Sequence, residues 1–235
     1  MDRHPFRLSD VTDLEDAYTS WLTSLHRLVS DPPRLAQWQD RRFAFAHQVG
    51  DLLTRANGRR SPVTGPVLYG VFTSGGLCYV GQTQEGERRL RDLPVGESHH
   101  VANTVPPELW ESVVVLRWPE LLAHISASER ETASALGPVV CGLVLEHRLQ
   151  VATSPPLNSR RRDSRGGWRA RNHAASRSRG ATHAASLPEL WHRAWEAWTA
   201  LADLDASGSN LFHTEAVAGH VVFPGALHRS RANTS

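Results

Sequence analysis

Residues 67–91 read VLYGVFTSGGLCYVGQTQEGERRLR, and this stretch carries the most specific pattern in the chain. Two runs rich in β-branched and aromatic residues, 67–72 and 77–81, flank Ser74-Gly75-Gly76. Glycine can adopt the positive φ that a tight hairpin turn demands. The stretch therefore predicts a β-hairpin followed by a short helix from about Glu85 to Leu93.

The residues after the hairpin predict another strand and two helical segments. Residues 112–118 are short and nearly all apolar, which indicates a strand in the centre of a sheet. A helix is expected over 126–136, Gly137-Pro138 should break it, and a further helix should run from about Val140 to Leu149.

The flanking regions are expected to be helical. Over residues 9–57, apolar residues recur at helical spacing, Thr12 with Glu15 forms a candidate capping box, and Pro32-Pro33 should separate two helices. Gly58 is placed to end the second helix in a left-handed cap. We expect this region to pack against the next one.

A Trp-rich helix is expected near the C-terminus. Ser186 and Glu189 form its candidate capping box, and Trp191, Trp195 and Trp198 share one face. Such a stripe is more typical of packing than of base stacking. Residues 209–235 show only a short apolar patch at 221–223.

Composition narrows the classes of protein that need consideration. The 235 residues contain no long apolar run typical of a membrane span and no secretory leader, and the two cysteines lie in apolar surroundings. A cytoplasmic protein with reduced thiols is expected. All 26 basic residues are arginine, so any phosphate contact would use a planar, bidentate, permanently charged donor. Codon bias is the simpler explanation for that choice.

The chain resembles the GIY-YIG nuclease superfamily over about residues 62–158. Gly70-Val71-Phe72 stands where the family has Gly-Ile-Tyr, and Tyr79-Val80-Gly81 where it has Tyr-Ile-Gly. Arg89 lies ten residues after Tyr79, as the family arginine does. Further on, Glu146 and Asn158 fit the family's helical glutamate and its Pro-Leu-Asn setting. The motif glycines are thus Gly70 and Gly81.

The resemblance implies an α+β fold in which helices flank a small, three-stranded, mostly antiparallel sheet. It also implies a divalent-metal-dependent endodeoxyribonuclease. Glu146 would hold Mg²⁺, or Mn²⁺, which suits hard oxygen ligands. Arg89 would bind a phosphate oxygen and Tyr79 would orient water or phosphate. Asn158 would fix the architecture of the site by hydrogen bonding.

Phe72 departs from the family pattern because it lacks the hydroxyl of the first motif tyrosine. The interval of seven residues from Phe72 to Tyr79 is also shorter than is usual in the family. Tyr69 is not expected to replace Phe72, because three residues along a strand reverse the face. His99, His100 or His147 is the expected substitute for the missing group.

An arginine-rich segment follows Asn158 and is the expected contact for double-stranded DNA. Between residues 159 and 182 there are eight arginines and one acid, although a flexible linker has the same composition. The expected contacts are Arg160, Arg161, Arg162, Arg165, Trp168, Arg169 and Arg171.

These observations divide the chain into a helical region (1–60), a nuclease-like domain (62–158), the arginine-rich segment (159–185) and a C-terminal helix with a tail (186–235). A restriction-type or modification-dependent enzyme is the expected member, with the N-terminal helices completing a clamp or a homodimer. Two alternatives stay open, namely a catalytically weak DNA-binding protein and a member recruited to small-molecule chemistry.

Overall fold

The computed structural model divides the chain into two compact units, Met1–Phe45 and Ala46–Ser235. The boundary between these units lies inside the second helix, whereas the sequence suggested a domain boundary near residue 60. The second unit continues through the C-terminal residues, so the Trp-rich helix shares a core with the nuclease-like region. The structure describes residues 8–56, 61–96, 101–162, 167–173, 175–205, 213–216 and 218–227.

The first unit consists of helix α1 (Leu8–Val29) and the beginning of α2 (Pro32–Thr54). Asp31 accepts a hydrogen bond from the backbone N–H of Arg34 and so caps the start of α2. Thr12 lies inside α1, so the expected capping box at Thr12 and Glu15 does not begin the helix. Gly58 lies outside the described residues.

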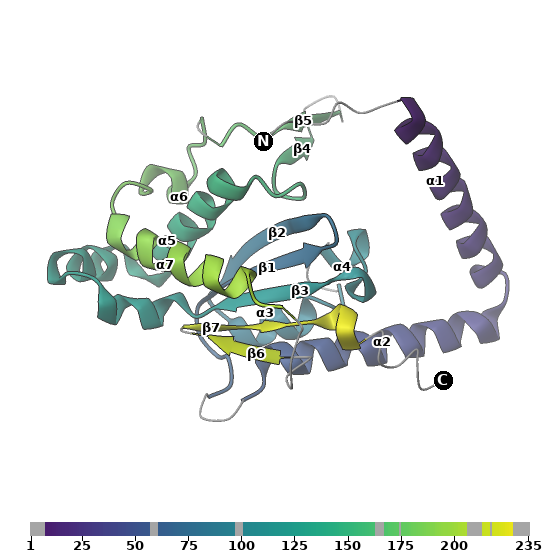
Figure 1. Cartoon of the computed structure of the whole chain (residues 1–235), viewed down its shortest axis with the longest axis horizontal. Helices are drawn as coiled ribbons and strands as arrows, with labels where there is room; N and C mark the ends of the chain where they lie inside the picture. The colour runs from purple at the N-terminus through teal and green to yellow at the C-terminus, as the bar shows by residue number, and fades with distance from the viewer. Residues whose placement is uncertain are drawn as a thin grey trace. The chain divides into compact units, whose positions relative to one another are not determined.

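A five-stranded antiparallel sheet forms the centre of the second unit (Figure 1). The predicted hairpin is confirmed, with Gly76 at φ 97 in the turn, and β3 is central as expected. The sheet has two more strands than predicted, because the apolar patch at 221–223 belongs to a C-terminal hairpin that pairs with β3. The spatial order is β2 (Gly76–Thr83), β1 (Val67–Thr73), β3 (Ser112–Leu116), β7 (Gly219–Val222) and β6 (His213–Ala216).

Helices α5 (Ala127–Thr153) and α7 (Pro188–Ala202) cover one face of the sheet. Alternate strand residues, including Leu68, Val80 and Val114, join these helices in the main apolar core. The break predicted in α5 is present, since Gly137 has φ 76 and ψ 163 immediately before Pro138.

The opposite face of the sheet meets the end of α2 and the short helix α3 (Gly86–Asp92). His220 pairs with Val115, which pairs with Tyr69, so these three side chains share a face. The His220 ring lies 3.0 Å from the carbonyl oxygen of Leu53 in α2. The remaining short elements are α4 (Val101–Thr104), η1 (Pro107–Leu109), η2 (Trp118–His124), β4 (Arg160–Arg162), β5 (Trp168–Ala170) and α6 (Arg179–Thr182).

Two carboxylates join the N-termini of α5 and α7. Glu129 in α5 accepts hydrogen bonds from the backbone N–H groups of Glu189 (3.0 Å) and Leu190 (2.7 Å) in α7. Glu189 in turn accepts from the backbone N–H and the hydroxyl of Ser126, each at 2.7 Å. The expected capping box at Ser186 and Glu189 is therefore not formed, because Glu189 serves the neighbouring helix.

None of the helices in the described part of the chain is both long enough and apolar enough to span a membrane.

Candidate active site

Two tyrosines lie side by side on the sheet face opposite α5 and α7. Tyr69 on β1 pairs with Gly81 on β2, and Tyr79 pairs with Val71, so the two phenol rings are diagonal neighbours. Their centroids are 6.1 Å apart, and the two hydroxyls are hydrogen-bonded. A Cβ atom on Gly81 would approach within 2.6 Å of the Tyr69 ring, so glycine at this position makes room for the pair.

Phe72 points to the other face of the sheet and takes no part in this pair. Its ring lies 6.5 Å from that of Trp198 in α7. A Cβ atom on Gly70 would come within 2.5 Å of the same indole. Tyr69 and Phe72 face opposite sides of the sheet, as expected from the sequence. Phe72 faces the core, whereas Tyr69, which was not expected to take part in the site, lies beside Tyr79.

Tyr69 is therefore the residue that shares the candidate site with Tyr79, and sequence reasoning missed it. The spacing carried a signal for this residue. Tyr69 lies ten residues before Tyr79, whereas Phe72 lies only seven residues before Tyr79. Tyr69 is 1% exposed and Tyr79 is 8% exposed. Tyr79 is thus the slightly more exposed residue of the pair, and the Tyr69 hydroxyl is placed to orient the Tyr79 hydroxyl.

Arg89 and Glu146 are close enough to act on the charge of both tyrosines. Burial raises the pKa of the Tyr69 hydroxyl to about 12, while the Arg89 guanidinium opposes this rise and the Glu146 carboxylate adds to it. Burial, the neighbouring Tyr69 and Glu146 likewise raise the pKa of Tyr79. Both hydroxyls are therefore neutral near pH 7. Arg89 on α3 and Glu146 on α5 thus lie within electrostatic range of the two tyrosines, although α5 covers the other face of the sheet.

Glu146 is a partly buried carboxylate with weak charge compensation. Burial raises its pKa to about 7, and Arg171 opposes that rise. One carboxylate oxygen accepts a hydrogen bond of 3.1 Å from Gln150, one turn along α5. A carboxylate that is desolvated and only lightly paired gains from a nearby cation, so the site fits a divalent metal. No group of three or more His, Cys, Asp or Glu side chains with metal-binding geometry occurs within the described ranges.

Asn158 holds the strand that carries Tyr79. Its side-chain oxygen accepts from the Val80 N–H at 2.7 Å, and its amide nitrogen donates to the Val80 carbonyl at 2.9 Å. Asn158 is 8% exposed. The side chain engages both backbone groups of the central motif residue, which is the kind of structural role that the sequence suggested.

The start of the arginine-rich segment lies beside Glu146. Strands β4 and β5 form a two-stranded antiparallel ribbon, and the Arg171 N–H donates to the Ser159 carbonyl at 2.6 Å. Arg169 and Arg171 are exposed. Arg171 acts on the charges of Glu146, His147 and His173.

Several predicted contacts cannot be placed in the site. Arg160, Arg161, Arg162 and Trp168 are located by their backbone only, as strand residues of the ribbon. Arg165, His99 and His100 lie outside the described residues.

His147 is the one candidate substitute base that the structure locates. His147 follows Glu146 in sequence, and the centroid of its ring lies 6.3 Å from that of the His173 ring. Burial lowers the pKa of both histidines, and the nearby Arg171 lowers both further. Neutral imidazoles are therefore favoured beside the carboxylate.

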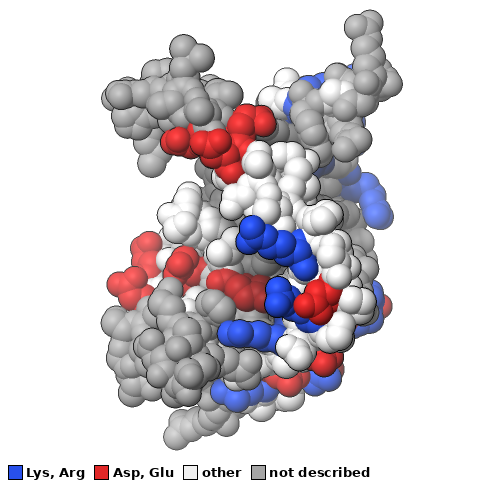
Figure 2. Space-filling view, turned by 90° about the vertical axis from the view of Figure 1, so that its right-hand side faces the viewer, with Lys and Arg blue, Asp and Glu red and all other residues white. Residues whose placement is uncertain are grey.

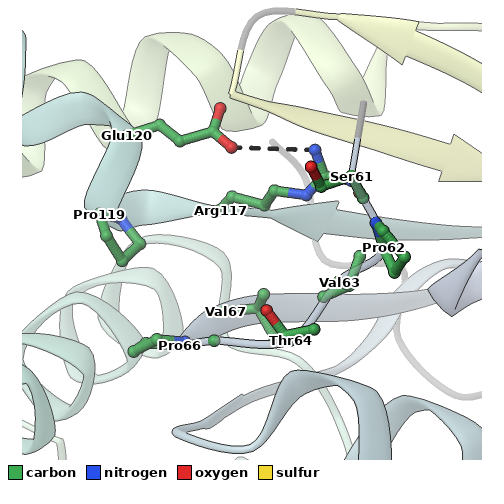
Figure 3. Close-up of a pocket in the computed structure, with 10 residues that line it drawn as sticks. Ser61, Pro62, Val63, Thr64, Pro66, Val67, Arg117, Pro119 and Glu120 are labelled. Atoms are coloured by element: carbon green, nitrogen blue, oxygen red, sulfur yellow. Dashed lines mark hydrogen bonds and ion pairs between the residues drawn. The ribbon is translucent and has the colours of Figure 1, made fainter. Parts of the chain in front are cut away.

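The cavity between residues 61–67 and 117–120 is not lined by the clustered side chains. Its volume is about 550 Å³, and Arg117 there reaches the Ser61 carbonyl and Glu120 (Figure 3). On the face drawn in Figure 2, arginine and acidic side chains of the described residues are interspersed and form no large patch of one sign.

Comparison of the chain with protein-family models, with curated proteins and with solved structures finds no match.

Proposed function

We propose that this protein is a divalent-metal-dependent DNA endonuclease of the GIY-YIG type. The observation that carries the proposal is the convergence of Tyr69, Tyr79, Arg89 and Glu146, with Asn158 fixing the strand between them. Phe72 lacks the hydroxyl of the first motif tyrosine. Tyr69 lies on the same sheet face as Tyr79, so it would supply that hydroxyl, which supports the proposal.

Each residue has a chemical task in phosphodiester hydrolysis. A bound Mg²⁺ or Mn²⁺ would supply Lewis-acid stabilisation of the phosphate charge, and Glu146 would hold it. Arg89 would form charge-assisted hydrogen bonds to a non-bridging phosphate oxygen. The neutral Tyr79 hydroxyl, oriented by Tyr69, would accept a hydrogen bond from the attacking water.

The β4–β5 ribbon is proposed to contact the DNA substrate. A two-stranded ribbon fits the major groove of B-form DNA, and arginines suit bidentate phosphate contacts. Its connection to Asn158 and the position of Arg171 beside Glu146 would hold the duplex near the reacting phosphate. Binding should therefore weaken steeply as salt rises.

A plasmid-cleavage assay tests the proposal. Purified protein with Mg²⁺ or Mn²⁺ should nick or linearise unmodified or modified DNA, and Glu146→Gln should abolish the reaction. Tyr69→Phe should lower the cleavage rate by about 100-fold. Its matched control, Phe72→Tyr, adds a hydroxyl on the opposite face and should leave the rate within about threefold.

Two results would favour other functions. Salt-sensitive DNA binding without cleavage of any substrate would support a catalytically inactive DNA-binding protein. An equal cleavage rate in wild type and Glu146→Gln would show that the nuclease activity does not come from this site. If the protein neither binds nor cleaves DNA, the result would support small-molecule chemistry.

A further inference from the structure

Helix α1 carries an apolar stripe with heptad spacing over three heptads. The stripe consists of alternating steps of three and four residues, which is the pattern that pairs helices in coiled coils. Its members are Val11, Leu14, Tyr18, Trp21, Leu25 and Leu28.

Three large side chains of this stripe are exposed, and Leu25 and Leu28 are partly exposed. Leu14 is 61% exposed, Tyr18 54% and Trp21 53%. The Tyr18 and Trp21 rings contact each other, with centroids 5.6 Å apart. Within the first unit, α1 and the beginning of α2 meet at their ends and do not lie side by side (Figure 1). Helical stability in water comes mostly from packing of an apolar face, so pairing of this stripe with another apolar surface would stabilise the helix.

The charges of α1 are separated along its length. Asp10, Asp13, Glu15 and Asp16 lie in the first half, while His26 and Arg27 lie in the last turn. A parallel pair would place acidic halves side by side. An antiparallel pair would place each acidic half beside a basic end, which is electrostatically complementary.

We propose that two copies of this chain pair through α1 in an antiparallel coiled coil. With the two-fold axis between residues 19 and 20, Tyr18 packs against Trp21 of the second copy. Leu14 then packs against Leu25 of the second copy. Both layers repeat symmetrically across the axis, as a two-fold interface requires.

Sedimentation analysis of the full chain tests the pairing. The wild type should sediment as a dimer at micromolar concentration. Trp21→Glu should raise the dissociation constant by about 100-fold or more, because it places a charge in a central layer. Ser20→Glu, at the neighbouring position outside the stripe, should change it by less than about threefold. A monomeric wild type, or equal effects of the two variants, would overturn the proposal.

The orientation can be measured with spin labels at three positions outside the stripe. The labels are attached at Asp13→Cys, Ser20→Cys and Arg27→Cys. These positions follow one another at intervals of seven residues, so they lie on one side of the helix, outside the proposed seam. The native Cys78 and Cys141 are buried, and labelled wild type controls for them. In an antiparallel pair, the two copies of an outer label are offset along the helix axis by roughly 13–15 residues. At a rise of about 1.5 Å per residue, this offset separates them by roughly 20–25 Å. The labels at residue 20 should be closest.

Short distances at all three positions would indicate a parallel pair and would overturn the antiparallel arrangement. Both measurements are made without DNA or metal, so their outcome is independent of the proposed nuclease activity.

Discussion

Replacing Glu146 with glutamine should stabilise the metal-free protein at alkaline pH. The folded chain holds this carboxyl in a partly buried position where its pKa is raised from 4.5 to about 7. Glutamine has nearly the same shape and resembles the protonated acid. It therefore removes the desolvation of a charge without opening a cavity.

The direction of the stability change with pH follows from the direction of the pKa change. A carboxyl whose pKa is higher in the folded state contributes stability that is fully present below its unfolded pKa. That contribution is lost as pH rises through the folded value of about 7. The wild type should therefore lose stability between about pH 4.5 and 8, whereas Glu146→Gln should not.

The size of the effect follows from the same pKa change. At 1.36 kcal/mol for each pH unit, a rise from 4.5 to about 7 corresponds to about 3 kcal/mol. Because the side chain is partly accessible to solvent, we expect about 1–3 kcal/mol in favour of the variant at pH 8. At pH 5 the difference should fall below about 1 kcal/mol.

Urea unfolding with EDTA at pH 5 and pH 8 measures this difference. Glu131→Gln is a matched control, because Glu131 is exposed on the same helix. A second series with Mg²⁺ should stabilise the wild type and not the variant, because only the carboxylate would bind the metal. A Glu146→Gln protein that is no more stable than wild type at pH 8, or equally stabilised at both pH values, would refute the reasoning.

Three substitutions test the packing that supports the site. Glu129→Ala should lower the free energy of unfolding by about 2–3 kcal/mol, because it leaves two amides at the start of α7 without their carboxylate; an unchanged melting temperature would contradict this. Asn158→Asp should cost about 2–3 kcal/mol, because it places an acceptor opposite the Val80 carbonyl, and a loss below 0.5 kcal/mol (on the order of measurement error) would count against it. Gly70→Ala should cost about 1–3 kcal/mol by overpacking against the α7 indole, whereas Gly75→Ala, in the open turn, should be nearly neutral in the same thermal-unfolding assay.

The hairpin and the kinked helix were predictable because their signals are local. Alternating β-formers around Ser74-Gly75-Gly76 determine the turn, and Gly137-Pro138 cannot continue a regular helix. The strand pairing of β7 with β3 joins segments about a hundred residues apart in sequence, so no local pattern near 221–223 could specify it.

The candidate site was only partly predictable from sequence. The period of two in a strand established that Tyr69 and Phe72 face opposite sides, but it does not say which side the core occupies. That choice depends on Trp198, which lies far along the chain and packs against Phe72 and Gly70. The motif Ser186 to Glu189 fits a capping box, yet Glu189 binds Ser126 because a tertiary contact outcompetes the local one.

The hydrogen bonds between the Asn158 side chain and the Val80 backbone also cover the edge of the sheet, which disfavours aggregation through that edge. Strand β2 is the last strand on its side of the sheet, and an open strand edge is a template for pairing with other chains. Here the segment that follows α5 occupies that edge, since the Leu157 N–H donates to the Cys78 carbonyl and Asn158 satisfies Val80. The residues that position Tyr79 thus also terminate the sheet, and a variant that releases them should aggregate.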